Sequence, residues 1–242
     1  MAGIRSSDMR LIVGQKEFSN VLSQLSMDTS ISELDDSVAQ TRDMEYLPEM
    51  VSSTLSASGR WTGDPNEINR YIKSTLHEAT LIAGSLDGKN YELGKFIRTA
   101  QSNPVSLGSR VNATFGVRLA EGELIDAREV FRHKFSAGGT FTGDVIDLGA
   151  AIASKAHKIY VYYFPSGNTT PGSTQIKIQH ATARGGAYGD ADSHTFNVTA
   201  LSKTDPAEDE ATYSLQRYMR VQAIVSGASK AGEIVVLMTE TY

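Results

Sequence analysis

Apolar and polar residues alternate along much of the chain. In residues 111–119 every odd position holds an apolar residue, and every even position holds a polar residue or glycine. Residues 21–31 alternate in the same way. Their apolar face carries Val21, Leu25, Met27 and Ile31, and their polar face carries Gln24, Ser26, Asp28 and Ser30. A period of two predicts β-strands that have one buried face.

Strand-like patterns recur along the rest of the chain. They cover residues 11–13, 54–61, 141–148, 159–164, 174–179, 195–199, 218–225 and 234–239. Residues 159–164 (IYVYYF) have no polar face apart from the tyrosine hydroxyls, which predicts a central strand covered on both sides. Strands of this number favour a mainly β (α+β) fold, an antiparallel sandwich or barrel. We expect a single domain over residues 1–242, in which 109–242 complete the sandwich begun by 1–108.

One segment predicts a flanking α-helix over about 65–83. Asp64 is a suitable N-cap, Pro65 fits the first helical position, and Glu67 stands where a capping box places a carboxylate. The residues that follow form an apolar stripe and a stop signal: Ile68, Tyr71, Ile72, Leu76, Ala79 and Gly84. Because such a stripe needs apolar surface to cover it, we expect the helix to pack on the sheet.

Three stretches rich in glycine, proline, serine and aspartate predict loops between the strands. They cover residues 166–173, 184–192 and 203–210. Within the second, the glycines of residues 184–189 predict a turn with positive φ. Within the third, Asp205 and Pro206 resemble a helix start, but no apolar stripe follows, which favours a loop or a single turn.

Composition and charge exclude several classes of protein. The chain has no cysteine, so it has no disulfides, thiol nucleophiles or thiolate metal sites. Residues 1–108 hold 10 basic and 14 acidic residues (−4), and residues 109–242 hold 13 and 14 (−1), which sum to the net charge of −5. This balance argues against a dedicated nucleic-acid binder. The apolar runs are too short to span a bilayer, so we expect no membrane partner.

Candidate chemistry is sparse. The five histidines are His77, His133, His157, His180 and His194, and none has a metal-ligand spacing. A carboxylate pair for glycoside hydrolysis could come from Asp144, Asp147, Asp190 and Asp192, but nothing selects a pair. We therefore expect no enzyme, and no catalytic, cofactor-binding or metal-ligating residue.

Four tyrosines admit two interpretations. Tyr160, Tyr162, Tyr163 and Tyr188 could form a platform on which sugars stack. Packing within and across strands is the favoured interpretation, because aromatic residues at strand positions usually fill the core.

The order of the segments resembles bacteriophage tail tube proteins. An alternating strand (21–31) leads into an acidic stretch, then residues 41–50 (TRDMEYLPEM), the strand 54–59 (TLSASG) and the capped helix. In that family a long hairpin-like loop precedes an aromatic-Leu-Pro or aromatic-Ile-Pro segment, a Ser/Thr strand ending in glycine, and a helix. The second half is similar to the closing strands of longer members, at residues 145–149 (VIDLG), 159–164, 175–179 (QIKIQ), 196–199 (FNVT) and 217–221 (RYMRV).

The resemblance implies a structural virion protein, the major tail tube subunit. Six copies would close a ring, and stacked rings would form the channel for DNA ejection into the host. The implied partners are other copies of the chain, the tape measure protein and duplex DNA that passes without specific binding. The implied location is the virion tail, after assembly in the host cytoplasm.

A projecting loop over about 28–50 is the candidate contact between rings. It contains seven acids (Asp28, Glu33, Asp35, Asp36, Asp43, Glu45 and Glu49) against the single base Arg42. It ends in an apolar group formed by Tyr46, Leu47, Met50 and Val51. The alternative is a solvated loop with a charged tip. We expect Gln24, Ser26, Asp28 and Ser30 to line the channel, where an acidic or neutral wall would leave DNA mobile.

A second function stays open for this sequence. The strands of the second half also resemble jelly-roll modules that bind sugars or decorate capsids. The alternative is therefore a jelly-roll carbohydrate-binding or capsid-decoration protein.

Overall fold

The computed structural model describes residues 9–13, 16–18, 22–35, 46–60, 79–85, 90–102, 112–165, 173–197, 207–226 and 231–240. Every strand pair in these residues is antiparallel. The described part contains strands and turns and no helix, which confirms the mainly β fold. Within it, no helix has the length and apolar character needed to cross a membrane.

The strands are numbered in the order in which they occur along the chain. Their bounds are β1 Met9–Val13, β2 Lys16–Glu17, β3 Leu22–Asp35, β4 Tyr46–Arg60, β5 Ala79–Ser85, β6 Asn90–Ser102, β7 Asn112–Phe135, β8 Gly139–Thr142, β9 Ile146–Asp147, β10 Ile152–Pro165, β11 Ser173–Ala181, β12 Gly189–Asn197, β13 Ala207–Leu215, β14 Tyr218–Val225 and β15 Gly232–Glu240.

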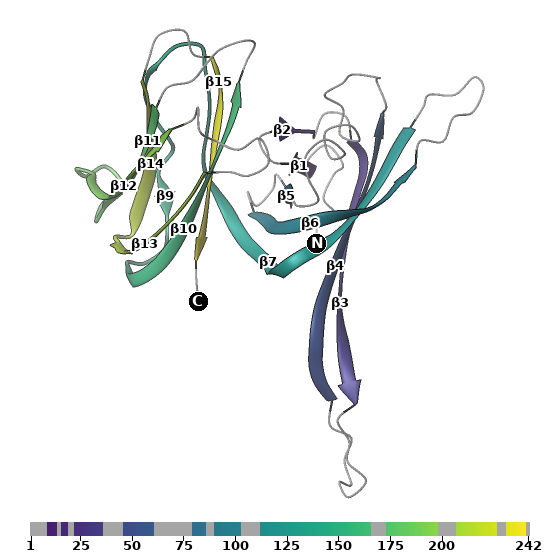
Figure 1. Cartoon of the computed structure of the whole chain (residues 1–242). Coiled ribbons are helices and arrows are strands. Elements are labelled where there is room, and N and C mark those ends of the chain that lie inside the picture. The colour runs from purple at the N-terminus through teal and green to yellow at the C-terminus, as the bar shows by residue number, and fades with distance from the viewer. Residues whose placement is uncertain are drawn as a thin grey trace, which may run out of the picture.

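Two sheets contain these strands (Figure 1). The larger sheet, sheet A, has the order β13-β10-β15-β7-β6-β5-β1-β2, and β4 joins β7 and carries β3. The smaller sheet, sheet B, has the order β12-β11-β14-β8, with β9 also paired to β14. In Figure 1 sheet B lies on the far side of β10 and β15 from the strands β1 to β6.

The 24-residue strand β7 links the two halves of the chain. Its first part pairs with β4 through residues 112–118, and its last part pairs with β15 through residues 128–135. Its other edge pairs with β6, from Asn90 opposite Arg128 to Ser102 opposite Thr114. One continuous strand therefore belongs both to the N-terminal sheet and to the C-terminal sandwich.

The sandwich core lies between sheet B and the C-terminal part of sheet A. From sheet A it takes alternate residues of β10 and β15, namely Ile159, Val161, Tyr163, Ile234, Val236 and Met238, together with Val130, Phe131 and Phe135 of β7. From sheet B it takes Ile176, Ile178, Met219, Val221, Ala223 and Val225. The period of two explains this core, because each strand directs every second side chain inward.

A second core covers the opposite face of β10 and β15. Tyr160, Tyr162, Val235 and Leu237 pack there with Ile12, Tyr91, Leu93 and Ala127. The five residues 159–163 are all at most 4% exposed. The prediction that 159–164 is a central strand covered on both sides is confirmed. The two halves of the chain thus share apolar surface as well as β7.

The predicted helix is wrong at its C-terminal end. Residues 79–83 form part of β5, which pairs with β1 on one side and β6 on the other. Leu81 and Ile82 favour a strand once ladders are available on both edges, so tertiary pairing outweighs the helical pattern. Residues 64–78, which include the rest of the predicted helix, lie outside the described residues.

Two loop predictions also need correction. Of residues 203–210, predicted as a loop or single turn, residues 207–210 belong to β13, which pairs along β10, and residues 203–206 lie outside the described residues. Of the predicted loop 184–192, residues 184–188 form a turn, whereas residues 189–192 belong to β12. The glycines of this turn do not have positive φ; among the described glycines, Gly149 does, at 79°. The prediction that residues 1–242 are one domain, with 109–242 completing the sandwich begun by 1–108, stays a prediction.

Burial on both faces of β15 can be tested by substituting alanine for a core residue on each face. Ile234 packs in the sandwich core and Leu237 in the second core, and both are at most 1% exposed. We expect Ile234→Ala and Leu237→Ala each to lower the free energy of unfolding by about 2–5 kcal/mol. The control Ile125→Ala, at a residue that is 41% exposed, should cost less than about 1 kcal/mol. Urea denaturation measures all three; a Leu237→Ala variant as stable as the control would contradict the second core.

Candidate assembly edges and the central charge cluster

The β3–β4 hairpin extends away from the body of the molecule (Figure 1). Residues 54–59 of β4 lie between β3 and β7 and pair with both, whereas residues 46–53 pair with β3 alone. At about 3.4 Å per residue, these eight residues reach roughly 25 Å beyond the edge of β7. The segment predicted as a projecting loop over 28–50 does project, but residues 28–35 and 46–50 are strand. Residues 36–45 lie outside the described residues.

The base of this hairpin has one polar face and one buried face. Ser53, Leu55 and Ala57 are at most 2% exposed. Thr54 and Ser56, which alternate with these residues along β4, are exposed. On the paired strand β3, the residues Gln24, Asp28 and Ser30 are also exposed. The polar face predicted for residues 21–31 is confirmed, with Ser26 half-buried. Sequence alternation therefore identified the solvent side of the sheet correctly.

Most open strand edges in the described part are protected. β12 pairs only with β11 and carries Asp190 and Asp192, and β13 pairs only with β10 and contains residues 208–210 (EDE). Among the remaining open edges, β2, β8 and β9 have two to four residues each, and residues 46–53 of β4, which pair with β3 alone, contain Pro48 and Glu49. Charge and shortness are the usual devices that prevent edge-to-edge association.

The outer edge of β3 lacks this protection. No described strand pairs with it, and residues 22–32 hold a single charge, Asp28. A second open edge lies on the opposite side of the same sheet, because β5 pairs with β6 only as far as Phe96. Residues 97–102 of β6 therefore have β7 as their only partner among the described strands, and they hold a single base, Arg98.

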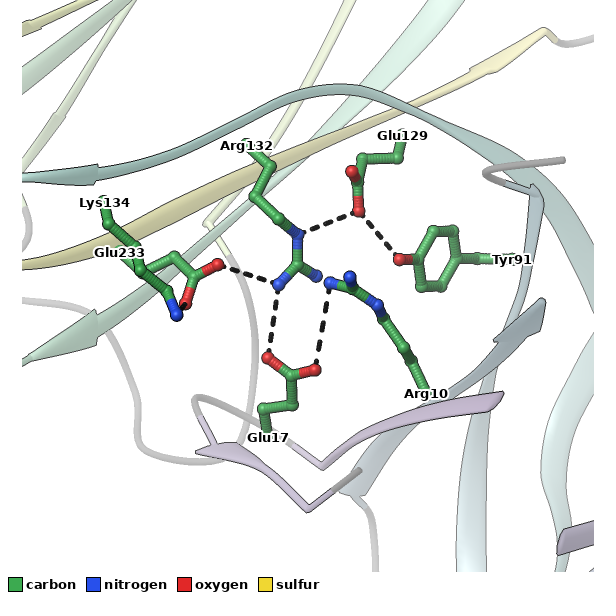
Figure 2. Close-up of polar contacts among 7 residues, drawn as sticks. All are labelled: Arg10, Glu17, Tyr91, Glu129, Arg132, Lys134 and Glu233. Carbon is green, nitrogen blue, oxygen red and sulfur yellow. Dashed lines mark hydrogen bonds and ion pairs between the residues drawn. The ribbon is translucent and has the colours of Figure 1, made fainter. Parts of the chain in front are cut away.

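A charge cluster joins the first strands to the sandwich (Figure 2). The guanidinium of Arg132 on β7 donates to three carboxylates: Glu129 at 3.1 Å, Glu233 of β15 at 2.8 Å and Glu17 of β2 at 3.3 Å. The side chains of Arg132 and Glu129 are 17% and 6% exposed. The hydroxyl of Tyr91 donates to Glu129 at 2.7 Å. Arg10 and Lys134 lie at the rim, 3.9 Å from Glu17 and 3.7 Å from Glu233.

Electrostatic interactions within the cluster favour the charged form of the Arg132 guanidinium. Burial alone would lower the pKa of the Arg132 guanidinium, but Glu129, Glu17 and Glu233 outweigh it and raise that pKa. Burial, together with the charge of Glu129, raises the pKa of the Tyr91 hydroxyl, which therefore stays a donor. Since the charges inside the cluster are paired, it can be buried between β2, β7 and β15.

A β-bulge explains how Glu129 and Arg132 meet. Residues three apart on a regular strand point to opposite faces. Opposite β15 the register skips Val130, because Val236 pairs with Phe131 and Leu237 pairs with Glu129. The extra residue turns Glu129 and Arg132 to the same side. Sequence analysis missed this cluster, and alternation offered no signal for it because the bulge interrupts the period.

The histidines occupy different environments. His157 is fully buried against the ring of Tyr213 at 4.7 Å, and His133 stacks on Phe141 at 4.4 Å. Nδ1 of His180 accepts a hydrogen bond from the backbone of Gln216 at 3.3 Å. The side chains of His77 and His194 lie outside the described part. Among the described residues, no three His, Asp or Glu side chains are placed to hold a metal ion together.

Three of the four candidate catalytic aspartates have local partners. Asp147 accepts hydrogen bonds from Nε and Nη2 of Arg217, both at 2.9 Å, and from the backbone N–H of Gly149 at 2.8 Å; these bonds lower the pKa of Asp147 to about 2. Asp190 contacts Lys177 at 2.6 Å, and Asp192 accepts the backbone N–H of Ser193 at 2.8 Å. Asp144 is exposed. These contacts suit turn and strand positions.

The four tyrosines considered as a sugar platform lie in two different environments. Tyr160, Tyr162 and Tyr163 are at most 4% exposed and lie in the cores, which confirms packing for these three. Tyr188 is half-buried on the turn before β12, and the guanidinium of Arg220 lies over its ring at 4.2 Å.

Comparisons with known proteins give structural likenesses. No family model matches the sequence, and no curated protein matches it. A chain in the virion of a gene transfer agent particle is similar at 15% identity and a TM-score of 0.43, over 50% of this chain and 97% of that one. The Dit protein of phage SPP1 is similar at 7% identity and a TM-score of 0.34, over 97% and 99%. A carbohydrate-binding module, CBM28, is similar at 15% identity and a TM-score of 0.29, over 57% and 77%. At such identities and TM-scores, these likenesses establish no shared function.

Removal of Arg132 should show that the cluster is desolvated. Arg132→Ala leaves Glu129 buried without its counter-charge, and we expect a loss of about 3 kcal/mol in the free energy of unfolding at neutral pH. The control Lys134→Ala removes a side chain that is 81% exposed and should change stability by less than about 0.5 kcal/mol. Urea denaturation compares the two.

A double substitution separates the cost of an unpaired buried charge from the loss of the packing that Arg132 provides. Glu129→Gln combined with Arg132→Met leaves no unpaired charge at the most buried pair, and it should recover part of the stability lost in Arg132→Ala. If Arg132→Ala were no less stable than Lys134→Ala, the cluster would contribute only as a surface ion pair.

Proposed function

We propose that this chain is a structural subunit of a phage-type tail tube, the major tail tube protein, that closes into hexameric rings. The observation that carries the proposal is the long edge of β3, which holds one charge over residues 22–32 and has no partner among the described strands. In a monomer, the unpaired backbone groups of such an edge promote aggregation. In a ring, a strand of a second copy can pair with them.

The sheet β3-β4-β7-β6 can be continued by identical copies. A ring needs a heterologous contact between two different surfaces, and residues 97–102 of β6 offer the second edge on the opposite side of the sheet from β3. Each neighbouring pair within the sheet is antiparallel, so β3 of one copy placed beside β6 of the next continues the alternation. Within residues 22–32 of β3 and residues 97–102 of β6, the single charges Asp28 and Arg98 have opposite signs.

A ring of six such sheets would enclose a wide channel. Four strands from each copy give 24 strands, which at about 4.8 Å per strand measure roughly 37 Å between opposite backbones before strand tilt is counted. The polar face at the hairpin base would line this channel with Gln24, Ser26, Asp28 and Ser30. A neutral to acidic wall does not trap duplex DNA, because it offers no cations to replace the counterions of DNA.

The remaining parts have places in this arrangement. The hairpin tip, within residues 28–50, projects from the sheet and would contact the next ring. The sandwich formed by sheet B and the strands β10 and β15 would form the outer wall, with residues 1–242 acting as one unit through the shared β7. The channel would hold the tape measure protein and later duplex DNA, in the virion tail after assembly in the host cytoplasm.

The sandwich favours a second candidate function. It has its own two-sheet core and an outward polar face that carries Arg220 and Tyr188. A jelly-roll carbohydrate-binding or capsid-decoration protein would use such a face without forming rings.

Proline substitution tests the β3 edge. Consecutive residues of a strand direct their N–H groups to opposite edges, so one of Asp28→Pro and Thr29→Pro removes an N–H from the open edge alone. That variant should fold and give no rings or tubes by electron microscopy, whereas the wild-type protein forms them. The matched control is designed in the same way on β12: of Ser193→Pro and His194→Pro, the variant that folds should still assemble. Tubes of wild-type length from the folded β3 variant, or a wild-type protein that stays monomeric, would refute the proposal.

Charge reversal at the hairpin tip tests the contact between rings. We expect Asp35→Lys combined with Asp36→Lys to leave folding and ring formation intact and to shorten or abolish stacks, because the tip meets the next ring; Asp36 lies outside the described residues. The control is Asp209→Lys combined with Glu210→Lys on β13, which makes the same change of charge on the sandwich. Stacks of equal length in both variants would count against residues 28–50 as the contact.

A further inference from the structure

The outward face of sheet B carries a pre-ordered polar surface. Residues of β11 and β14 alternate between the sandwich core and the outside. Across three strands, Asp190, Gln179 and Arg220 stand in one row of the register. We use the name Arg220 face for this row and its neighbours: Lys177, Gln179, Tyr188, Asp190, Arg220 and Gln222.

Arg220 is fixed in place while its terminal nitrogens stay open. Its Nε donates to the side-chain carbonyl of Gln179 at 2.9 Å, and its guanidinium carbon lies 4.2 Å from the centre of the Tyr188 ring. Gln179 is 8% exposed, and the hydroxyl of Tyr188 donates to the carbonyl of Arg184 at 2.9 Å. Within the described part, Arg220 has no ion pair and no hydrogen bond from Nη1 or Nη2. A rigid fork of N–H donors therefore faces solvent.

The rest of the face alternates acceptors with donors. Asp190 is neutralised by Lys177 at 2.6 Å and accepts from the amide of Gln179 at 2.7 Å, and these contacts lower its pKa. It keeps free acceptor capacity, since a carboxylate has about four lone-pair sites. Gln222 donates to Thr142 at 3.3 Å and leaves its carbonyl oxygen open. Lys177 and Arg220 against Asp190 give the face a charge of +1.

This chemistry matches hydroxyl groups better than other ligands. A hydroxyl donates one hydrogen bond and accepts others, so a sugar ring satisfies neighbouring donors and acceptors together. A polyanion would meet Asp190 on the same row, and a protein partner would need an apolar centre. The shape of the fork also suits paired oxygens.

We propose that the Arg220 face is a saccharide-binding site. Arg220 would donate to adjacent oxygens of one sugar unit, while Asp190 and Gln222 accept from its hydroxyls. Gln179 and Tyr188 are positioning residues that hold the guanidinium. The site is separate from the β3 and β6 edges, so it does not depend on ring formation, and in Figure 1 sheet B lies on the side of the sandwich away from the hairpin.

An array of immobilised neutral and uronic-acid oligosaccharides, probed with the full chain, tests the site. We expect at least one saccharide to bind, and Arg220→Lys, which keeps the charge and loses the fork, to weaken that binding at least about tenfold. The matched control is Arg217→Gln, just before β14, which should bind as the wild type does because Nε and Nη2 of Arg217 already donate to Asp147. Inorganic phosphate and duplex DNA serve as anion probes.

A second measurement does not depend on how the variants fold. The Nε–Hε resonance of Arg220 in the wild-type protein should shift when the bound saccharide is titrated, and it should not shift with phosphate. Absence of any saccharide binding, equal binding of phosphate or DNA, or unchanged binding by Arg220→Lys would each overturn the site. Electron microscopy of the same samples reports ring formation separately, so failure of this site and failure of the proposed assembly are distinguishable.

Discussion

The arrangement of the molecule depends on a buried guanidinium. Arg132 stands on β7, the strand that both halves share, and holds carboxylates from β2, β7 and β15 within 3.3 Å. A strand of 24 residues could bend where its partners change. The cluster opposes this, because any shift of β2 against β15 would leave a buried charge unpaired. We interpret the cluster as a device for specificity: it fixes the angle between the hairpin sheet and the sandwich.

Alternation along the sequence predicted those strands that are regular on both faces. Residues 218–225 alternate in burial as their sequence does, and residues 159–164, which lack a polar face, are covered on both sides as predicted. The second half of β7 escaped prediction because the bulge at Val130 brings Glu129 and Arg132 to one side, which looks like a polar break in the sequence. The helix prediction failed over residues 79–83 since local capping signals carry no information about the ladders that β1 and β6 offer. Long-range partners decided each of these cases.

The distribution of charge over the strand edges separates surfaces that must stay single from those that can pair. Acids occupy β12 and β13 at the border of the sandwich, where pairing with another chain would be unproductive. Residues 22–32 of β3 and residues 97–102 of β6 hold one charge each, Asp28 and Arg98, of opposite sign. The head-to-tail contact proposed above would need two different edges that are free and complementary, and these two segments would meet that requirement.

The same logic accounts for the position of the Arg220 face. A ring that closes through β3 and β6 covers the hairpin sheet on its edges and inner side, so any further binding site must lie on the sandwich. Sheet B is the layer farthest from the shared core of Tyr162, Leu237 and Tyr91, because β10 and β15 stand between them. If both proposals hold, polymerisation would use backbone groups at strand edges and recognition would use side chains on a sheet face, without a shared residue. The Arg132 cluster joins β2, β7 and β15 within sheet A and would hold the hairpin strands at a constant angle to the sandwich.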